Sequence, residues 1–203
     1  MAARRVRVLG RVVRDPSLSV DAADVTLDGE PLDHAAGVLV ALHKPVGYVS
    51  SHNDREGETV FTLLPHHWLA RSPRPEAVGR LDKETSGLLV ITDDHELLHR
   101  LTSPKHAVDK VYVATLDGEP TDALVDLFAS GTLQLRSETQ PCRPATLRVV
   151  GDREAEVTIT EGKYHQVRRM FGACGLKVET LHRTRVGEWT IDSLASGEWR
   201  DLA

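Results

Sequence analysis

The chain has 203 residues, of which 40% are hydrophobic and 27% charged, and its 15 glycines and 10 prolines are scattered, so collagen-like, low-complexity and disordered proteins are excluded. The formal net charge of -5 argues against a protein that binds nucleic acid through overall basicity. Because the sequence has no apolar run near the roughly 20 residues of a membrane helix and no CxxC pair, we expect a cytoplasmic protein with free thiols.

The first three dozen residues predict short strands joined by tight turns. Strands are expected at residues 5–8, 11–13 and 25–27. The dipeptide Asp28-Gly29 is a strong turn signal after the last of them. A unit of this size can scarcely build its own core. We therefore expect residues 1–36 to be a small partial domain with a linker, and residues 37–203 to be the main domain.

The main domain combines many strands with three helices. The continuous apolar run at 88–92 predicts a strand that is buried on both faces. Helices are expected at about 94–102, 121–130 and 164–174, with Pro104, Gly131 and Gly175 as their stops. Further strands are expected at 38–43, 110–116, 145–150, 154–160, 177–181 and 186–191. The hairpin-length turns indicate an α+β fold with a mixed, largely antiparallel sheet flanked by helices.

A polar loop before the buried strand is the first candidate site. It reads Gly79-Arg80-Leu81-Asp82-Lys83-Glu84-Thr85-Ser86-Gly87. Arg80 and Lys83 flank Asp82, and nearby cations keep a carboxylate ionised and able to act as a nucleophile or base. The alternative is a surface loop in which Asp82 only forms a turn.

The segment 161–171 is the second candidate site. On a helix its apolar residues share one face, whereas His165, Arg168 and Arg169 lie nearly opposite. Residues 163–185 hold six basic residues and one acidic residue, which favours a local surface that binds phosphate or a carboxylate. No acid stands three or four positions after Lys163, Arg168 or Arg169. The alternative is an amphipathic helix whose charged face is only solvated.

Two further patterns allow a functional and a structural interpretation. Tyr112 faces away from the valines of its strand, so it is either a platform that stacks a base or a core residue. The run His95-Glu96-Leu97-Leu98-His99 matches the HExxH zinc motif. Thr102 and Lys105 stand where a metzincin has Gly and its third His, so we interpret the two histidines as an outward, solvated pair and expect no metal.

Taken together, three motifs resemble those of the RsuA-type pseudouridine synthases. They are Gly79-Arg80-Leu81-Asp82 with Thr85-Ser86-Gly87-Leu88-Leu89, then Lys110-Val111-Tyr112, then Glu161-Gly162-Lys163-Tyr164-His165-Gln166-Val167-Arg168-Arg169-Met170. Residues 38–203 follow the family pattern throughout, including His43-Lys44-Pro45-Val46-Gly47. The resemblance implies the pseudouridine synthase fold, an RNA-modifying isomerase, and no metal or organic cofactor.

The resemblance also implies roles for individual residues. Asp82 would be the essential nucleophile or base that assists cleavage of the uridine C1′–N1 bond, after which uracil turns and rejoins the ribose through C5. Tyr112 would stack on the flipped-out uracil, and Arg168 would pair with Asp82. Contacts to the substrate are expected from Arg80, Lys110, Lys163, His165, Gln166 and Arg169.

The substrate that the resemblance implies is ribosomal RNA. Details such as Tyr164-His165 and Leu181-His182-Arg183-Thr184-Arg185 look more like the small-subunit branch, so we expect one uridine of 16S rRNA, free or in an assembly intermediate, and a monomer without an obligatory protein partner. The alternatives are a large-subunit (23S) rRNA enzyme and a non-catalytic RNA-binding ribosome-assembly factor. A zinc peptidase is disfavoured.

The N-terminus departs from the family pattern. Family members commonly begin with an RNA-binding domain, the αL motif, whose leading helices precede strands like those expected before residue 32. Those helices are absent from this sequence. We therefore expect residues 1–36 to be a truncated remnant of that domain, and the chain to bind RNA more weakly than a relative that has the helices.

Overall fold

The computed structural model describes residues 5–103 and 105–202. Contacts between residues divide the chain into two compact units, Met1–Val38 and Leu39–Ala203. None of the helices in the described part of the chain has the length and apolar character that a bilayer span requires.

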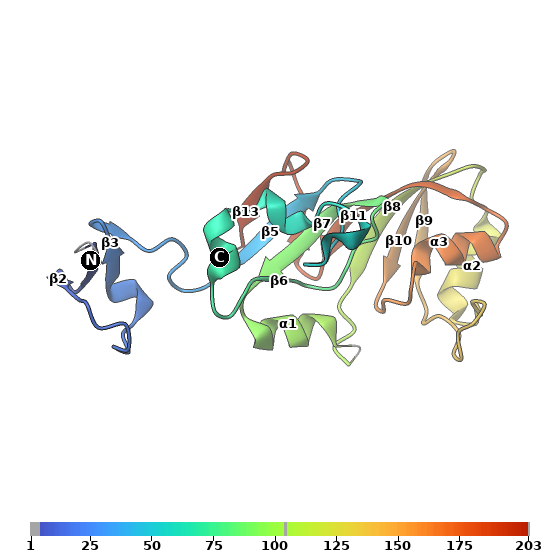
Figure 1. The fold of residues 1–203 in the computed structure, drawn as a ribbon. Coiled ribbons are helices and arrows are strands. Elements are labelled where there is room, and N and C mark those ends of the chain that lie inside the picture. Colours follow the sequence, from blue (N-terminus) through green and yellow to red (C-terminus); the bar gives the residue numbers. More distant parts are fainter. Residues whose placement is uncertain (1–4, 104, 203) are drawn as a thin grey trace. The chain divides into compact units, whose positions relative to one another are not determined.

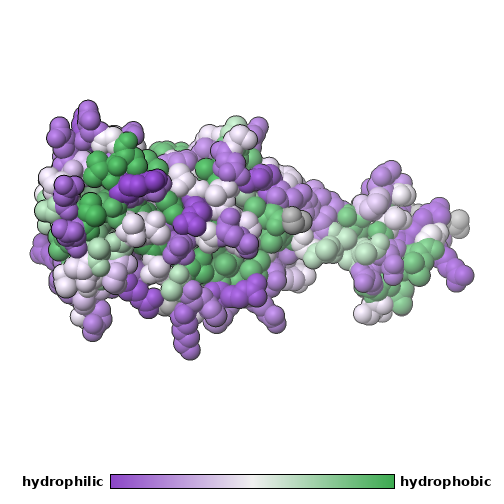
Figure 2. All heavy atoms as spheres, turned by 180° about the vertical axis from the view of Figure 1, so that it is seen from behind, coloured by the Kyte–Doolittle hydropathy of each residue, from purple (hydrophilic) through white to green (hydrophobic). Residues whose placement is uncertain are grey.

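The first unit is a small antiparallel sheet with the strand order β2-β1-β3-β4. Its strands are β1 (Val6–Val8), β2 (Arg11–Val12), β3 (Val25–Leu27) and β4 (Glu30–Pro31). The expected turn is confirmed, because Asp28 and Gly29 both take positive φ angles between β3 and β4. Hydrophobic atoms reach the surface of this unit on the face shown in Figure 2, and Leu9 is 75% exposed. The unit therefore leaves apolar side chains in contact with solvent.

The second unit is built on a nine-stranded sheet, with the order β13-β5-β7-β11-β8-β10-β9 along its main path (Figure 1). The short strands β12 and β6 pair with β11 and β7. The β7–β11 pair is parallel and the other pairs are antiparallel, which confirms the mixed, largely antiparallel sheet. The strands are β5 (Leu39–Lys44), β6 (Glu76–Ala77), β7 (Thr85–Thr92), β8 (Lys110–Leu116), β9 (Thr146–Gly151), β10 (Glu154–Ile159), β11 (Val178–Val186), β12 (Trp189–Thr190) and β13 (Trp199–Asp201).

Strand β11 differs most from the prediction. We expected separate strands at 177–181 and 186–191, but one strand runs from Val178 to Val186 between β7 and β8. The polar run His182-Arg183-Thr184-Arg185 reads as a break in the sequence, and its register does shift between Arg183 and Arg185. Pairing on both sides keeps these residues in the sheet and overrides their weak apolar pattern. This strand later supplies an unexpected site residue.

The three helices are α1 (His95–Thr102), α2 (Asp122–Ser130) and α3 (Gln166–Ala173). The Asp94 carboxylate accepts hydrogen bonds from the first turn of α1, and Gly131 ends α2 in the left-handed conformation, as expected. Pro104, the expected stop of α1, lies outside the described residues. Helix α3 begins later than expected because His165 is itself left-handed, with φ 45°. Phe128 of α2 packs on Phe171 of α3 with ring centroids 5.2 Å apart.

The burial of individual residues confirms two predictions, the buried strand and the solvent-exposed histidine pair. Leu88, Leu89, Val90 and Ile91 of β7 are completely buried. Leu98 and Leu101 of α1 pack against the core cluster on one side of this strand. The two histidines of α1 are exposed. Within the ranges that the structure describes, no group of three His, Cys, Asp or Glu side chains could hold a metal ion.

Gly87 allows β7 and β11 to approach each other closely. It pairs with Arg183 across the parallel ladder and has φ 116°, and a Cβ atom at this position would overlap the main-chain oxygen and nitrogen of Arg183. We expect Gly87→Ala to lower the free energy of unfolding by about 2–5 kcal/mol, through overlap and backbone strain together. Urea unfolding followed by circular dichroism measures this loss.

The matched control for this substitution is Gly172→Ala. Gly172 lies in α3, where an added Cβ would meet no atom within 4 Å. Alanine is the better helix former, so this variant should be about 0.5–1 kcal/mol more stable than the wild type. Equal stability of the two variants would show that the approach of β7 and β11 tolerates a side chain.

Candidate active site

The loop that carries Asp82 is held by its main chain. The Ser50 hydroxyl accepts a hydrogen bond from the Leu81 amide at 3.1 Å and donates one to the Leu81 carbonyl at 3.0 Å. The Thr85 amide donates to the Asp82 carbonyl at 3.0 Å, which closes a turn immediately before β7. These contacts leave the Asp82 side chain available, and it is 33% exposed. The sequence places a carboxylate on a rigidly supported loop, as the motif predicts.

Lys44 supports this loop from beneath. The residue is completely buried, and its ammonium donates to the carbonyls of Thr85 at 2.7 Å, Pro45 at 2.9 Å and Lys83 at 3.4 Å. Burial lowers the pKa of Lys44 from 10.5 to about 8, although the carboxylates of Asp82 and Glu84 act in the opposite direction. The sequence analysis quoted Lys44 within a motif and assigned it no role.

The lowered pKa of Lys44 predicts a pH-dependent stability. Between pH 8 and 10.5 the unfolded chain binds more protons at this residue than the folded chain, so rising pH stabilises the fold. We expect the unfolding free energy of the wild type to rise relative to Lys44→Met over this range, by up to about 3 kcal/mol. Urea unfolding of both proteins at several pH values measures the difference. Lys177→Met removes an exposed lysine as a control, and a flat difference for Lys44→Met would contradict the prediction.

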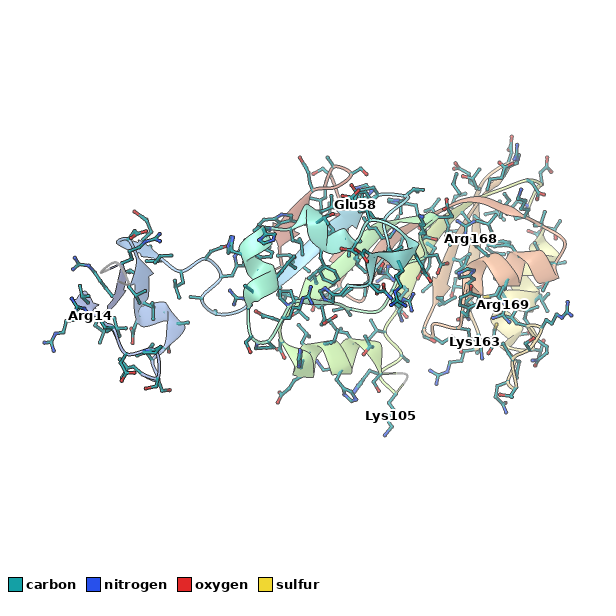
Figure 3. The ribbon with its side chains drawn as sticks, in the orientation of Figure 1. Arg14, Glu58, Lys105, Lys163, Arg168 and Arg169 are labelled. Carbon is teal, nitrogen blue, oxygen red and sulfur yellow. The ribbon has the colours of Figure 1, made fainter. Side chains whose placement is uncertain are left out.

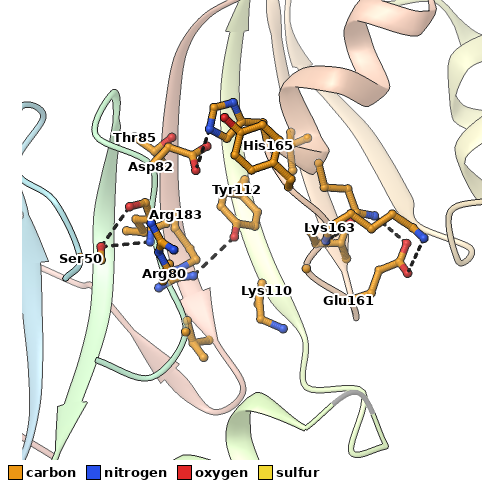
Figure 4. Close-up of a pocket in the computed structure, with 18 of the residues that line it drawn as sticks. Ser50, Arg80, Asp82, Thr85, Lys110, Tyr112, Glu161, Lys163, His165 and Arg183 are labelled. Carbon is orange, nitrogen blue, oxygen red and sulfur yellow. Dashed lines mark hydrogen bonds and ion pairs between the residues drawn. The ribbon is translucent and has the colours of Figure 1, made fainter. Parts of the chain in front are cut away.

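Asp82 faces His165 across the cavity mouth (Figure 4), with 3.4 Å between Oδ1 and Nε2. The predicted pair between Asp82 and Arg168 is not formed in this structure. The Arg168 guanidinium donates instead to the carbonyls of Glu84 at 2.9 Å and Val178 at 3.0 Å. Arg168 therefore ties the loop that carries Asp82 to β11 through main-chain atoms, and its planar fork suits two such acceptors.

A cavity of about 1010 Å³ opens beside Asp82. Tyr112 and Lys110 of β8 both line it, so Tyr112 faces the cavity as its alternation with the valines predicts. Arg80 also lines the cavity and is exposed. Burial lowers the pKa of Lys110, and the neighbouring Arg183 guanidinium lowers it further. The cavity thus places an aromatic ring and several cations near Asp82, and the acidic residues Glu56, Glu84 and Glu161 also line it.

Arg183 is the site residue that the sequence analysis missed. It is 1% exposed, its Nε donates to the Leu88 carbonyl at 2.8 Å, and its Nη1 lies 3.4 Å from the Tyr112 hydroxyl (Figure 4). Its Nη2 finds no hydrogen-bond acceptor within residues 5–103 and 105–202. A buried donor without an acceptor is destabilising, so this atom points to a ligand that accepts its hydrogen bond. The sequence carries no local signal for this position, because Arg183 stands within the polar run His182-Arg183-Thr184-Arg185.

Two of the basic residues at α3, Lys163 and Arg169 (Figure 3), have an acidic partner that the sequence does not reveal. Glu138 lies 2.7 Å from Arg169 and 3.8 Å from Lys163. Arg169 lowers the pKa of Glu138, first through their hydrogen bond. The Gln166 side chain is also engaged, because it donates to Glu161 at 2.7 Å and accepts from the Lys163 amide at 2.8 Å. The expected free cationic face is therefore largely neutralised by another segment.

The fold and the cavity define an α+β enzyme domain in which Asp82 lies at a cavity lined by Tyr112 and by several lysines and arginines. A family model described as RNA pseudouridylate synthase matches residues 38–173. The ribosomal small subunit pseudouridine synthase A of Escherichia coli (strain K12) is 42% identical over 203 residues, which cover 98% of this chain and 85% of that protein. The protein of the same name from Pasteurella multocida (strain Pm70) is 39% identical, with the same coverage.

A solved structure agrees with these sequence relatives. The crystal structure of a pseudouridylate synthase matches with a TM-score of 0.77 and 34% identity, and the match covers 98% of this chain and 86% of that chain. The chain belongs to the RNA pseudouridylate synthase family.

Proposed function

We propose that this enzyme converts one uridine of small-subunit (16S) ribosomal RNA into pseudouridine, with Asp82 as the catalytic carboxylate. The observation that carries the proposal is the anchored loop, which holds Asp82 at a cavity lined by Tyr112 and Arg183. The named relatives from two bacteria support the small subunit as the source of the RNA. We also propose that the enzyme acts in the cytoplasm, since the named relatives are enzymes of the ribosomal small subunit, and that it acts as a monomer.

The reaction exchanges one bond for another at the ribose. The C1′–N1 bond of uridine breaks, the uracil turns, and a C1′–C5 bond forms, after which C5 loses its proton and N1 gains one. Asp82 acts as nucleophile or base in this sequence. The target base has to leave its stack to reach the carboxylate, and an aromatic ring offsets part of that loss. Tyr112 is the ring that the cavity offers for this purpose.

Charge stabilisation is the role that we propose for Arg183 and Lys110. Cleavage of the C1′–N1 bond leaves electrons on the detached uracil, and fixed donors in a poorly solvated cavity stabilise such charge strongly. The free Nη2 of Arg183 is suited to donate to a uracil carbonyl or to the Asp82 carboxylate. Lys110 is held nearby through a 3.1 Å hydrogen bond to the Val108 carbonyl. We propose that none of these steps requires a metal or an organic cofactor.

The other predicted RNA contacts fall into two groups. Arg80 and His165 lie at the cavity itself and are proposed as substrate contacts. Lys163, Gln166 and Arg169 are bound to acidic or main-chain partners, so we propose that they shape the segment before α3 and reach the RNA only secondarily. The first unit, with its exposed strands, is proposed to add RNA contacts.

The proposed function is tested by mapping the product. The protein is incubated with transcripts that cover 16S and 23S rRNA, and pseudouridine is located by carbodiimide-dependent stops of primer extension. We expect a single new stop in 16S rRNA. Stops only in 23S rRNA would reassign the substrate. RNA binding without any stop would identify a non-catalytic binding protein instead.

A further inference from the structure

Tyr164 exposes an aromatic ring at the wall of the cavity. The residue is 75% exposed, whereas Tyr112, on the same cavity, is 7% exposed. Its ring stacks on the His165 ring, with 3.8 Å between the centroids and 17° between the planes. Because His165 covers one face, the exposed area lies mainly on the opposite face of the Tyr164 ring. A flat apolar surface is thus presented to whatever enters the cavity.

His165 connects this ring to the catalytic carboxylate. Its φ of 45° and ψ of 39° are left-handed, a conformation that is strained for a residue other than glycine. In this conformation its Nε2 lies 3.4 Å from Asp82 Oδ1 while its ring supports Tyr164. Strain of this kind persists only where the surroundings fix it.

Arg169 supplies part of that fixation. Its guanidinium donates to the Tyr164 carbonyl at 2.9 Å, and its amide donates to the His165 carbonyl at 3.0 Å. Glu138 in turn holds the guanidinium at 2.7 Å. The ion pair with Glu138 makes Arg169 less available to bind phosphate. The same ion pair holds Arg169 where it anchors the main chain of the two stacked residues, Tyr164 and His165.

We infer that the free face of Tyr164 stacks on the nucleobase next to the target uridine and so contributes to the choice of substrate. This inference rests on the proposed function, because the cavity beside Tyr164 is the one that would admit the extruded nucleoside. Extrusion separates the target from its neighbours, which leaves a neighbouring base with an unstacked face. Aromatic side chains bind such faces with a substantial gain in affinity. The stack would then run from the RNA base through Tyr164 and His165 to Asp82.

The test is a double-mutant cycle between protein and RNA. The probe is a fluorescein-labelled 16S rRNA fragment in which pseudouridine is mapped, or the most tightly bound fragment if none reacts. It is compared with two abasic copies, one without the base on the 5′ side of the target uridine and one without the base on the 3′ side. In a fragment that does not react, the central uridine takes the place of the target. Fluorescence anisotropy gives the dissociation constants. We expect Tyr164→Ala to weaken binding of the intact fragment about tenfold or more, and Tyr164→Phe by less than about twofold.

Removal of the stacked base decides the inference. One of the two abasic fragments should bind the wild type as weakly as it binds Tyr164→Ala, because the same contact is lost in both cases. Val149→Ala, an exposed substitution on β9 outside the cavity, is the matched control. The inference is wrong if Tyr164→Ala binds the intact fragment as tightly as the wild type does. It is also wrong if the substitution weakens binding of both abasic fragments by the same factor as binding of the intact fragment. Absence of pseudouridine with the wild type would overturn the proposed function alone, since binding is read separately.

Discussion

Replacement of Asp82 by asparagine is expected to lower the single-turnover rate of pseudouridine formation by about 10⁴-fold or more. Asparagine keeps the size of the side chain but has no negative charge, so it can act neither as nucleophile nor as base. The turn at Thr85 and the contacts of Ser50 use main-chain atoms and remain possible in the variant. Release of tritium from C5-labelled uridine in the RNA measures the rate, because C5 loses its hydrogen in the reaction.

The affinity of this variant for RNA separates chemistry from binding. We expect the dissociation constant of Asp82→Asn to remain within about threefold of the wild-type value, because one carboxylate is a small part of an interface dominated by phosphate contacts. Glu84→Gln is the matched control, because it removes a negative charge from the same loop. Arg168 binds the main-chain carbonyl of Glu84, which the substitution leaves in place. Turnover by Asp82→Asn within tenfold of the wild type would remove Asp82 from the mechanism.

Substitution of Arg183 is expected to have the second largest effect. Arg183→Lys keeps the positive charge but loses the planar group that reaches both the Leu88 carbonyl and the Tyr112 hydroxyl. We expect the single-turnover rate to fall by about 10²–10³-fold, the magnitude typical of losing one fixed donor in a cavity of this kind. The same tritium-release assay measures it.

Stability has to be followed separately for Arg183, because the residue is buried. Arg183→Met leaves the Leu88 carbonyl without its donor, which costs about 1–3 kcal/mol in unfolding free energy. Thermal unfolding of both variants shows whether slow turnover reflects loss of the fold. Arg185→Lys, on the same strand and paired with Asp109 at 3.7 Å, should keep its turnover. A folded Arg183→Lys protein with normal turnover would exclude Arg183 from charge stabilisation.

The two arginines show how a motif can identify a site and still misassign a partner. The family resemblance implied Asp82 as the partner of Arg168, but in the structure the Arg168 guanidinium donates to two carbonyls. Arg183 lies in a strand that the sequence analysis divided in two, and the sheet brings it beneath Tyr112. Asp82 lies on an anchored loop at a cavity, and its catalytic role stays a prediction.

Local sequence determined most of the elements. The buried run in β7, the glycine that ends α2 and the alternation in β8 each depend on residues a few positions apart, and each was predicted. The same holds for the loop that carries Asp82, whose glycines and charged residues lie within one short segment. Such features need only the periodicity and the conformational preferences of neighbouring residues.

Only the tertiary structure decided which side chains meet in the cavity. Arg183 and the Leu88 carbonyl are 95 positions apart, and Arg169 and Glu138 are 31 positions apart. Contacts of this kind depend on strand order and register in the sheet, and a parallel pair such as β7–β11 has no signature in the sequence of either strand. The motifs therefore indicated a site from the sequence alone. The partner of each charged side chain could be assigned only from the tertiary structure.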